Sequence, residues 1–395
     1  MLLINLLLAF IFVVSAFTVL YTFIFSVSGH FMRKREYDCK NVYKKIAVLI
    51  PAYCEDAVIL QSANHALFQK YPSHKYDVIV IGDSLQKETI QQLKKLPLKF
   101  VEVKFETSTK SKSLNAAFDI ISDQYDIAVV LDADNLMKSD FLDKINAAFV
   151  NGCYAIQGNR QAKNINTSFA ILDAMSEEAN NHIFRKGQQA LGFSSSIIGS
   201  GMAISYLYLK QVMRDIDAVG GFDKELEMKL IGDNHKITFL SNAVVLDEKV
   251  QQSAVFASQR TRWISAQFIY LRKYFFKGVK ALLKGRLDYA NKTAHYALVP
   301  KILLIGFLLF VTTLCYFGND YLTVGFKSWT TLTVLYFTSF VIAIPRKFYN
   351  LKTLKALIFL PKAFAVMALA MFKVKGANKK FIHTPHSSHF EKESI

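Results

Sequence analysis

The chain has 395 residues, of which 52% are hydrophobic, and it carries 48 Lys and Arg against 31 Asp and Glu, a formal net charge of +17. Strongly basic proteins bind nucleic acids or anionic membrane surfaces; the high hydrophobic fraction favours a membrane protein and argues against a nucleic-acid partner. The four cysteines lack the spacing of zinc ligands or of a disulfide framework, which indicates reduced thiols.

Residues 1–30 are predicted to form an N-terminal transmembrane anchor. Positions 2–28 contain no charged residue, and about 20 apolar residues are enough to cross a bilayer. Arg33-Lys34-Arg35 follows this stretch, whereas a signal peptide would begin with its basic residues and end at a cleavage site. Because positive charge favours the cytoplasmic side, we expect an uncleaved anchor followed by a cytosolic domain.

Residues 44–263 alternate between strand-like and helix-like segments. Short apolar runs predict strands at 46–50, 78–81, 100–105 and 127–131, with helical stretches between them. This alternation is typical of an α/β domain with a mostly parallel, Rossmann-like sheet covered by helices on both faces. Ligands of such sheets bind beyond the carboxyl ends of the strands, so polar residues that follow strands are the first candidates for a functional site.

Asp132 and Asp134 follow the strand predicted at 127–131. Side chains two residues apart on an extended strand point to the same face, so we expect both carboxylates to reach one site. Carboxylate oxygens suit Mg²⁺ or Mn²⁺, and such ions usually also bind substrate phosphates. The same pair is also found in loops that cap a following helix, but the other polar residues at this edge favour metal binding.

Two other strands are also followed by polar residues. Pro51 is expected to end the pairing of the first strand, and Tyr53 and Glu55 are expected to face a nucleoside. Asp83 ends the second strand. Since the carboxyl ends of parallel strands share one edge of a sheet, we expect these residues to lie near Asp132 and Asp134.

Lys110 and Lys112 precede a predicted helix start at 113–115. Cations and backbone N–H groups at the beginning of a helix can bind a diphosphate. A segment that alternates lysine and serine is also typical of a solvated loop. The sequence therefore indicates a phosphate site here without excluding the simpler interpretation.

The C-terminal third of the chain is predicted to associate with a membrane. Residues 264–290 place apolar side chains at helical spacing with basic residues between them, which is typical of an interfacial helix, although a helix docked on a soluble domain shows the same pattern. Residues 296–345 are predicted to form two transmembrane helices. Residues 354–372 have basic residues on both flanks, which favours an interfacial or re-entrant helix, and residues 376–395 would form a cytoplasmic tail.

Taken together, these motifs resemble the membrane-bound family 2 glycosyltransferases, the group that includes the cellulose, chitin, hyaluronan and poly-N-acetylglucosamine synthases. The resemblance covers residues 44–275 and implies the GT-A fold and a nucleotide-diphosphate sugar as donor. In chain order, the motifs are Pro51-Ala-Tyr53 with Glu55, Asp83, Lys110 with Ser113-Leu-Asn115, Asp132-Ala-Asp134, Gly199-Ser-Gly201, an acidic helix start near Asp223, and Gln259-Arg-Thr-Arg262-Trp263.

The resemblance implies a role for each motif, with a UDP-sugar as the expected donor and Mg²⁺ or Mn²⁺ as the cofactor. The metal would bind Asp134 and Asp132. The donor would bind Pro51, Tyr53, Glu55, Asp83, Lys110, Lys112, Asn115, Asp132, Gln259 and Arg262. The acceptor would bind Gly199, Ser200, Gly201 and Trp263.

Physical chemistry agrees with the roles of the last motif. Gln259, Arg262 and Trp263 are spaced i, i+3, i+4 and share one face of a helix. Arginine offers a two-pronged donor for phosphate, and an aromatic face suits the apolar face of a sugar ring. A tryptophan at the membrane interface is the alternative interpretation for Trp263.

The catalytic base is the weakest point of the resemblance. The family carries a Glu-Asp pair before a helix, where this chain has Phe222-Asp223-Lys224-Glu225. A gapless match makes Asp223 the base, and a shift of two residues makes it Glu225. Asp223 could instead be a simple helix cap. Cys54 also replaces an Asn that is common in the family.

We therefore expect an inverting, metal-dependent glycosyltransferase of the cytoplasmic membrane, with its catalytic domain in the cytosol and a saccharide or a lipid-linked molecule as acceptor. Processive polysaccharide synthesis and a single transfer both stay open. One alternative is a degenerate, non-catalytic transferase subunit, which Phe222 and Cys54 favour. Another is a basic membrane-binding protein, which leaves the carboxylates at the sheet edge unexplained.

Overall fold

The structure, a computed structural model, describes residues 2–33, 35–39, 41–218, 220–251, 253–318 and 324–372. The chain forms two compact units, each described here by itself. The sheet unit comprises residues 34–164 and 194–249, and the helical unit comprises residues 1–33, 165–193 and 250–375. Residues 165–193 and 250–263, expected in the catalytic domain, thus belong to the helical unit, and the predicted tail at 376–395 lies outside the described residues.

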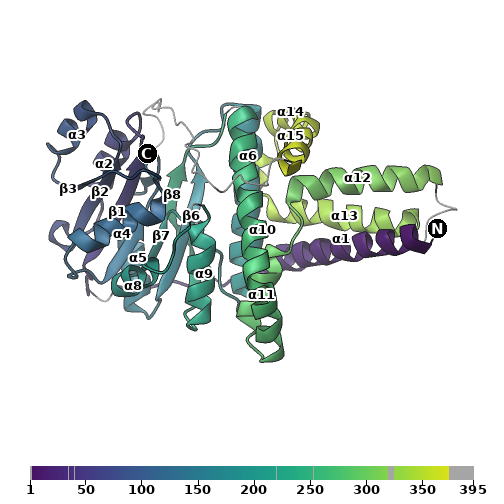
Figure 1. Cartoon of the computed structure of the whole chain (residues 1–395), viewed down its shortest axis with the longest axis horizontal. Helices are drawn as coiled ribbons and strands as arrows, with labels where there is room; N and C mark the ends of the chain where they lie inside the picture. The colour runs from purple at the N-terminus through teal and green to yellow at the C-terminus, as the bar shows by residue number, and fades with distance from the viewer. Residues whose placement is uncertain are drawn as a thin grey trace. The chain divides into compact units, whose positions relative to one another are not determined.

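A mixed sheet forms the centre of the sheet unit (Figure 1). Its eight strands follow the order β3-β2-β1-β4-β7-β6-β8-β5. Its strands are β1 (Ile46–Tyr53), β2 (Tyr76–Asp83), β3 (Lys99–Val103), β4 (Ile127–Val130), β5 (Leu136–Met137), β6 (Ala155–Ala162), β7 (Met202–Ser205) and β8 (Ile237–Asp247). The first four are mutually parallel, β6 is parallel to β8, and β7 and β5 run antiparallel to their neighbours. The predicted α/β class is confirmed, with a parallel first half.

Helices connect the strands of the sheet unit as the alternating pattern predicts. They are α2 (Ile59–Ala66), α3 (Lys87–Leu93), α4 (Lys110–Ile120), α5 (Phe141–Val150), α8 (Tyr206–Met213) and α9 (Phe222–Gly232). α4 begins three residues earlier than expected, because the Thr109 side chain caps it by accepting a hydrogen bond from the Lys112 N–H over 3.2 Å. Lys110 is consequently the first residue of the helix.

Pro51 does not end β1, contrary to expectation. It pairs in register with Ile81 of β2 inside a strand that continues beyond it. The Leu49 carbonyl accepts a hydrogen bond from the Leu131 N–H over 3.0 Å, and alternate residues of a strand face the same neighbour. The missing N–H of Pro51 therefore faces the space beyond the end of β4, and no ladder bond is lost.

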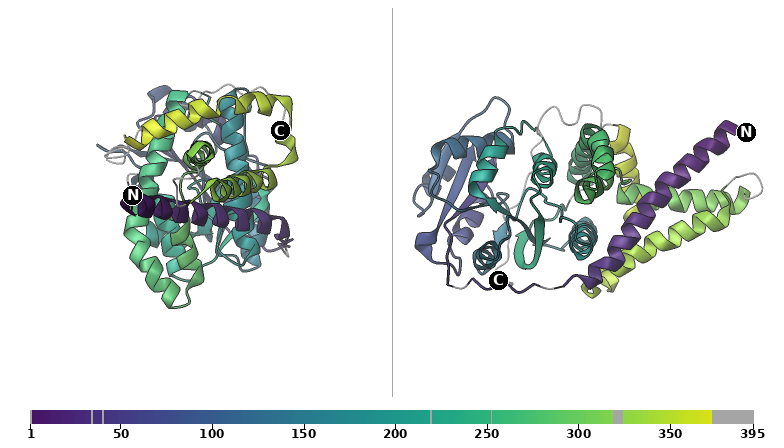
Figure 2. Two further views of the ribbon diagram at one scale, coloured as in Figure 1. Left: turned by 90° about the vertical axis from the view of Figure 1, so that its right-hand side faces the viewer. Right: turned by 90° about the horizontal axis from the view of Figure 1, so that it is seen from below.

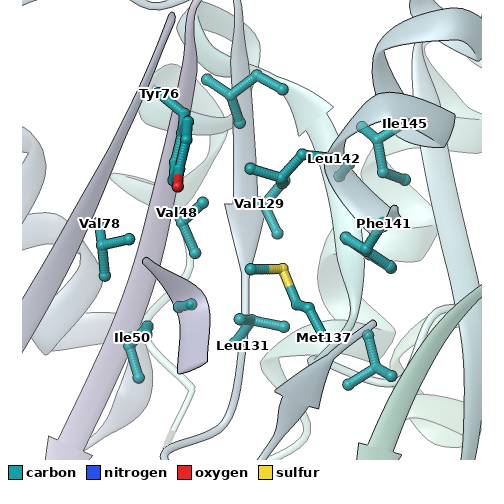
Figure 3. Packing of buried hydrophobic residues seen from close by; sticks show 14 of the residues in the cluster. Val48, Ile50, Tyr76, Val78, Val129, Leu131, Met137, Phe141, Leu142 and Ile145 are labelled. Atoms are coloured by element: carbon teal, nitrogen blue, oxygen red, sulfur yellow. The ribbon is translucent and has the colours of Figure 1, made fainter. Parts of the chain in front are cut away.

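The core of the sheet unit fixes the strands that carry the candidate motifs. Val48 of β1 and Val129 of β4 are completely buried, as are Phe141, Leu142 and Ile145 of α5. Figure 3 shows these side chains packed together between the strands and the helix. Because burial of apolar area contributes about 25 cal/mol per Å², this packing holds the carboxyl ends of β1 and β4 in fixed positions.

Residues 165–193 leave and rejoin the sheet unit at opposite ends of β8. The Asn164 side chain accepts a hydrogen bond from the Lys249 N–H over 2.7 Å, just after the last residue of the strand. The Ser194 hydroxyl accepts one from the N–H of Ile237, its first residue, over 3.3 Å. The segment between them is thus attached to two distant points of the sheet unit.

The helical unit contains the predicted membrane segments. Its helices are α1 (Leu2–Ser28), α6 (Ser168–Asn180), a π-helical turn (Asn181–Gly187), α7 (Gln188–Ala190), α10 (Ser253–Leu283), α11 (Leu287–Tyr296), α12 (Lys301–Gly318), α13 (Phe326–Ala343), α14 (Leu351–Leu357) and α15 (Leu360–Phe372). α1, α12 and α13 run side by side in the views of Figures 1 and 2. Trp329 of α13 is buried where they meet, with Phe12 at 5.0 Å and Phe307 at 5.9 Å between ring centroids.

One described helical segment, Leu6–Phe31, is by itself long and apolar enough to cross a membrane. α11 and α12, bent by 64° at the break between them, meet the same criterion as a pair. α12 and α13 have 18 residues each, slightly fewer than the roughly 20 that span a bilayer. The two spans expected at 296–345 therefore stay a prediction.

The segments expected at the membrane interface have boundaries that the sequence did not reveal. The single helix predicted at 264–290 is divided between two helices. Its first part is the second part of α10, and its last residues are the beginning of α11. Gly285, with a left-handed backbone (φ 73°), lies between them. The segment 354–372 is divided between α14 and α15. Pro361 is the second residue of α15, in the first helical turn, where proline is well tolerated.

Candidate functional site

The carboxyl ends of β1 and β2 lie side by side at one edge of the sheet. Their last residues, Tyr53 and Asp83, are register partners, and the Cys54 N–H donates to the Asp83 carbonyl over 3.1 Å. The residue that follows each strand has a left-handed backbone, with φ 53° at Cys54 and 57° at Ser84. This conformation costs a non-glycine residue about 1–2 kcal/mol, and such strain clusters at functional sites.

Asp83 is completely buried, and the protein satisfies its carboxylate only in part. The Ser84 hydroxyl donates to Oδ1 over 2.9 Å, whereas Oδ2 is buried with no hydrogen-bond partner among the described residues. A buried carboxylate oxygen without a donor is costly, so this atom is suited to accept a hydrogen bond from a ligand. Tyr53 and Glu55 are half-buried, and the neighbouring Cys54 thiol, followed by burial, raises the pKa of Tyr53.

The spacing of Asp132 and Asp134 predicts that they share one face of an extended strand, but in the structure they do not. β4 ends at Val130, and the chain then turns, with the Asn135 N–H donating to the Asp132 carbonyl over 3.1 Å. Asp132 is partly exposed, whereas Asp134 is buried. Asp134 accepts hydrogen bonds from the Asn135 side chain (3.1 Å) and from the Glu248 N–H (3.2 Å). The two carboxylates lie in one turn but have different surroundings.

Lys110 joins the turn that contains Asp132 to a second loop. Its ammonium group lies 2.5 Å from Asp132 Oδ1, donates to the Gly199 carbonyl over 2.7 Å, and lies 5.6 Å from the centroid of the Phe222 ring. Lys112 instead turns back and donates to the Thr107 carbonyl over 3.0 Å. Both lysines were predicted to bind the donor. Lys110 contacts other candidate residues, whereas the ammonium group of Lys112 is bonded to Thr107.

Asn115, the third candidate on α4, holds two helices together. Its amide nitrogen donates to the carbonyl of Met213, the last residue of α8, over 2.9 Å. The second polar atom of its side chain, Oδ1, is buried with no hydrogen-bond partner among the described residues. Asn115 thus has a structural contact and retains one acceptor for a ligand.

Gly199, Ser200 and Gly201 form a tight loop beside the start of α9. Gly199 and Gly201 have left-handed backbones, with φ 76° and 60°. A Cβ at Gly199 would lie 3.2 Å from the Phe222 ring and 3.7 Å from the Asp223 Cβ, so glycine permits this close approach. The loop therefore brings the start of α9 close to Lys110.

Ser200 points into the protein, contrary to the expectation that it contacts the acceptor. It is completely buried. Its hydroxyl accepts a hydrogen bond from the Asp132 N–H over 2.9 Å and donates to Asn135 Oδ1 over 2.5 Å. Ser200 thus connects the glycine loop to the turn that carries the two aspartates.

Asp223 and Glu225 both lie in the first turn of α9, in different surroundings. Asp223 is half-buried beside the glycine loop, and burial raises its pKa, while the positive charges of Lys224 and Lys110 lower it. Glu225 is buried. Residues two apart on a helix do not share a face, so one base position does not suit both side chains. A carboxyl with a raised pKa is suited to general-base catalysis.

Two buried amides that were not predicted from the sequence support this site. Gln157 of β6 accepts a hydrogen bond from the Ile198 N–H (3.0 Å) and donates to the Ser200 carbonyl (3.0 Å). Asn135 donates to Asp134 and Asp247, each over 3.1 Å. Gln157 lies in a strand that also contains Asn159, Arg160 and Gln161, so the sequence of β6 does not distinguish it from its polar neighbours. Its burial does, because buried polar side chains normally have a specific partner.

The divalent ion implied by the resemblance is compatible with these side chains. Among the described residues there is no group of three or more His, Cys, Asp or Glu side chains that could hold a metal ion. Magnesium in phosphate-handling sites is usually bound by one or two carboxylates together with the phosphates. Asp132 offers a partly exposed carboxylate, and hydrogen bonds hold Asp134 in the same turn. The residues therefore fit an ion that is shared with a substrate diphosphate.

Gln259, Arg262 and Trp263 lie on α10 in the helical unit. Their residues are helical, so the spacing places them on one face, as predicted. Gln259 and Arg262 are half-buried, and Trp263 is 39% exposed. Gln259 Oε1 is buried with no hydrogen-bond partner in the described part of the chain. Arg260, which was not among the residues predicted for the site, places its guanidinium carbon 4.2 Å from the Trp263 ring centroid.

Comparison with known proteins gives consistent matches. Residues 44–266 match the family described as "Glycosyltransferase like family 2". The "Probable glycosyltransferase YdaM" of Bacillus subtilis (strain 168) is 24% identical over 319 residues, which cover 76% of this chain and 74% of that protein. A dolichyl N-acetyl-α-D-glucosaminyl phosphate 3-β-D-2,3-diacetamido-2,3-dideoxy-β-D-glucuronosyltransferase of Methanococcus voltae is 22% identical over 249 residues, 58% of this chain and 75% of that protein.

A solved structure shares the fold. A mannosyltransferase from Pyrobaculum calidifontis, in complex with GDP-Man and Mn²⁺, superposes with a TM-score of 0.52 at 14% sequence identity, over 85% of this chain and 96% of that one. At this identity the likeness concerns the fold alone. Together with the family match, it confirms the predicted GT-A class.

Proposed function

The chain belongs to the glycosyltransferase-like family 2, and on this premise we propose that it transfers a sugar from a nucleotide-diphosphate sugar to a saccharide or lipid-linked acceptor, with inversion. One observation carries the proposal. Lys110 binds both Asp132 and the Gly199 carbonyl, and Gly199 lies against Asp223. Four motifs that are remote in the sequence therefore meet within the sheet unit.

The nucleotide would bind at the carboxyl ends of β1 and β2. Asp83 Oδ2, buried with no hydrogen-bond partner among the described residues, would accept a hydrogen bond from the nucleoside. Tyr53 and Glu55 would line the same position, and the backbone of Pro51 would approach it from β1. Lys110 would release Asp132 and bind the diphosphate, because a lysine ammonium group is a suitable phosphate ligand.

A divalent ion would bind Asp132 and Asp134 together with the donor diphosphate. When bound, Mg²⁺ or Mn²⁺ would stabilise the negative charge that develops on the leaving diphosphate. Ser200 and Asn135 hold the turn that contains both carboxylates. The solved mannosyltransferase binds Mn²⁺, which supports the use of such an ion in this fold.

Asp223 is proposed as the catalytic base. As a carboxylate it would remove the proton of an acceptor hydroxyl, whose oxygen would attack the anomeric carbon while the bond to the nucleotide diphosphate breaks. A positioned general base typically contributes 10²–10⁴-fold to a rate. The half-buried position of Asp223 beside Gly199 favours it over the buried Glu225.

The roles of the α10 residues are proposed from the resemblance and from their own surroundings within the helical unit. We assign Gln259 and Arg262 to the diphosphate and Trp263 to the acceptor sugar, as the resemblance implies. The partly exposed indole of Trp263 and the unsatisfied Oε1 of Gln259 support these assignments.

The proposed location is a cytoplasmic membrane, with the sheet unit in the cytosol. The apolar segment Leu6–Phe31 would serve as the anchor. On α10, the side chains of Phe276, Val279 and Leu283 are exposed, and Lys277 and Lys280 lie between them. An exposed apolar face flanked by lysines suits the surface of an anionic membrane.

The acceptor class is open to one decisive experiment. Membranes that contain the protein are incubated with radiolabelled UDP- and GDP-sugars in the presence of Mn²⁺ or Mg²⁺, and the label is separated into free sugar, lipid-linked sugar and polymer. We expect metal-dependent transfer from one donor. A ladder of products would indicate processive polysaccharide synthesis, and a single added sugar would indicate one transfer, as the dolichyl-linked substrate named for the Methanococcus relative suggests.

Other outcomes would contradict the proposal. If nucleotide sugars bind but are never turned over, the protein is a non-catalytic transferase subunit. If no nucleotide sugar binds while anionic lipids bind in a salt-sensitive manner, it is a basic membrane-binding protein.

A further inference from the structure

The guanidinium group of Arg260 is stacked between two aromatic rings of its own helix. Its carbon lies 4.7 Å from the Phe256 ring centroid and 4.2 Å from that of Trp263. These residues are spaced i−4 and i+3, so they adjoin Arg260 on the helix surface, and a guanidinium plane stacks well on aromatic faces. Phe256 is buried and packs against Phe169, with ring centroids 5.8 Å apart. The stack therefore has a fixed inner end and a partly exposed outer end.

A second helix holds Arg260 in this position. Its Nη2 atom donates to Oδ1 of Asp173 on α6, and both side chains are about nine-tenths buried. A buried charge that loses its partner is strongly destabilising, so the guanidinium cannot turn away without leaving Asp173 unpaired. α6 thus sets the position of Arg260, and Arg260 sets the position of the Trp263 ring.

We propose that Arg260 is a positioning residue: anchored by Asp173, it holds the Trp263 indole as a rigid platform for the acceptor sugar. This inference rests on the proposed function, since it gives Trp263 an acceptor to bind. A side chain that is already fixed in its binding orientation loses less conformational entropy when a ligand arrives. The chain of contacts from Asp173 through Arg260 to Trp263 is called the brace below. Loss of the brace should weaken the positioning of the acceptor and let water compete for the sugar of the donor.

Two measurements on the full-length protein test the brace. The first is acrylamide quenching of Trp263 fluorescence. The chain has two tryptophans, and Trp329 is buried, so the Trp263→Phe protein supplies the blank. The second is the ratio of sugar transferred to water to sugar transferred to the membrane acceptor, a ratio that general destabilisation of the fold would not change.

Two variants break the brace in different ways, and a third is the matched control. Arg260→Lys keeps a positive charge for Asp173 but removes the planar group, and Asp173→Asn removes the anchor. Glu177→Gln changes a buried carboxylate of the same helix that pairs with Arg185 over 3.1 Å. Because cation–π stacking contributes about 0.5–2 kcal/mol, we expect the first two variants to raise the water-to-acceptor ratio roughly twofold to thirtyfold and to increase quenching.

The control variant should change neither quantity. Unchanged quenching in Arg260→Lys, or an equal rise in Glu177→Gln, would overturn the brace. Increased quenching with an unchanged transfer ratio would also overturn the proposal, because Trp263 would then be held for a reason unrelated to the acceptor. If quenching rises but the unaltered protein turns over no nucleotide sugar, the brace stands and the proposed function fails.

Discussion

The two ends of β2 carry the same residue in opposite circumstances. At the amino end, the Asp77 carboxylate accepts hydrogen bonds from the Tyr125 hydroxyl (2.7 Å) and from Lys99 (3.2 Å). At the carboxyl end, Asp83 is completely buried with one oxygen unsatisfied among the described residues, and the next residue is left-handed. The amino end is satisfied by the protein itself, whereas the carboxyl end stores strain and keeps an acceptor for a ligand. This difference distinguishes a residue that stabilises the fold from a residue that is suited to bind a ligand.

The largest expected effect comes from the acidic start of α9, at the active end of the sheet. Asp223→Asn should abolish sugar transfer, by about 10²–10⁴-fold, and leave donor binding intact, because the amide cannot accept the proton of the acceptor hydroxyl. Transfer rates and donor affinity are measured on the same preparation. Glu225→Gln is the matched variant: near-normal transfer in Asp223→Asn together with an inactive Glu225→Gln protein would make Glu225 the base.

The second effect tests the comparison directly by changing each aspartate of β2 to asparagine. Asp83→Asn should weaken donor binding about tenfold to a hundredfold, because a hydrogen bond to a charged acceptor contributes about 1.5–3 kcal/mol. Asp77→Asn should instead lower the free energy of unfolding by about 0.5–1.5 kcal/mol and leave donor affinity unchanged. Donor titration and thermal unfolding separate the two. A loss of donor affinity in Asp77→Asn would remove the distinction between the two ends.

The third effect concerns pH. Burial raises the pKa of Asp223, and a general base acts only when deprotonated, so activity should fall with decreasing pH at a higher pH than for an ordinary carboxyl group. The charge of Lys110 opposes this shift. Lys110→Met should therefore move the acid limb of the kcat/KM profile, which reports the free enzyme, further up in pH. Lys112→Met, which changes a lysine bonded to Thr107 instead, should move it less, and equal shifts would refute this coupling.

The smallest effect is a gain in stability at the strained end. Cys54→Gly or Cys54→Asn should stabilise the protein by about 0.5–1 kcal/mol, since both residues adopt positive φ more readily than cysteine. Cys54→Ala keeps the strain and is the control. Thermal unfolding is the measurement, and an equal gain from alanine would show that the backbone angle is not responsible.

The sequence predicted those features that depend on local pattern. Apolar runs located the first four strands, and the geometry of parallel strands placed Tyr53 and Asp83 at one edge, as the register confirms. The sequence did not predict the turn at Asp132–Asn135, because pairing with β1 and β7 decides where β4 stops. The same holds for Pro51, whose place inside β1 depends on the length of the neighbouring strand.

Long-range hydrogen bonds were the second limit of the sequence. Ser200 points inward because its hydroxyl binds Asn135, which lies 65 positions earlier in the chain. Gln157 supports the glycine loop from a strand that carries no recognisable motif. Neither contact leaves a spacing pattern in a single sequence, so the candidate residues could be found but not the network that holds them.

The attachment of residues 165–193 to opposite ends of β8 limits how the sheet unit can be produced alone. β8 has 11 residues, which span roughly 35 Å at about 3.3 Å per residue. A fusion of Asn164 directly to Ser194, or through a short glycine-serine bridge, would strain both strand ends. A replacement of at least about ten extended residues, laid along the strand, is required before the sheet unit can be expressed without residues 165–193.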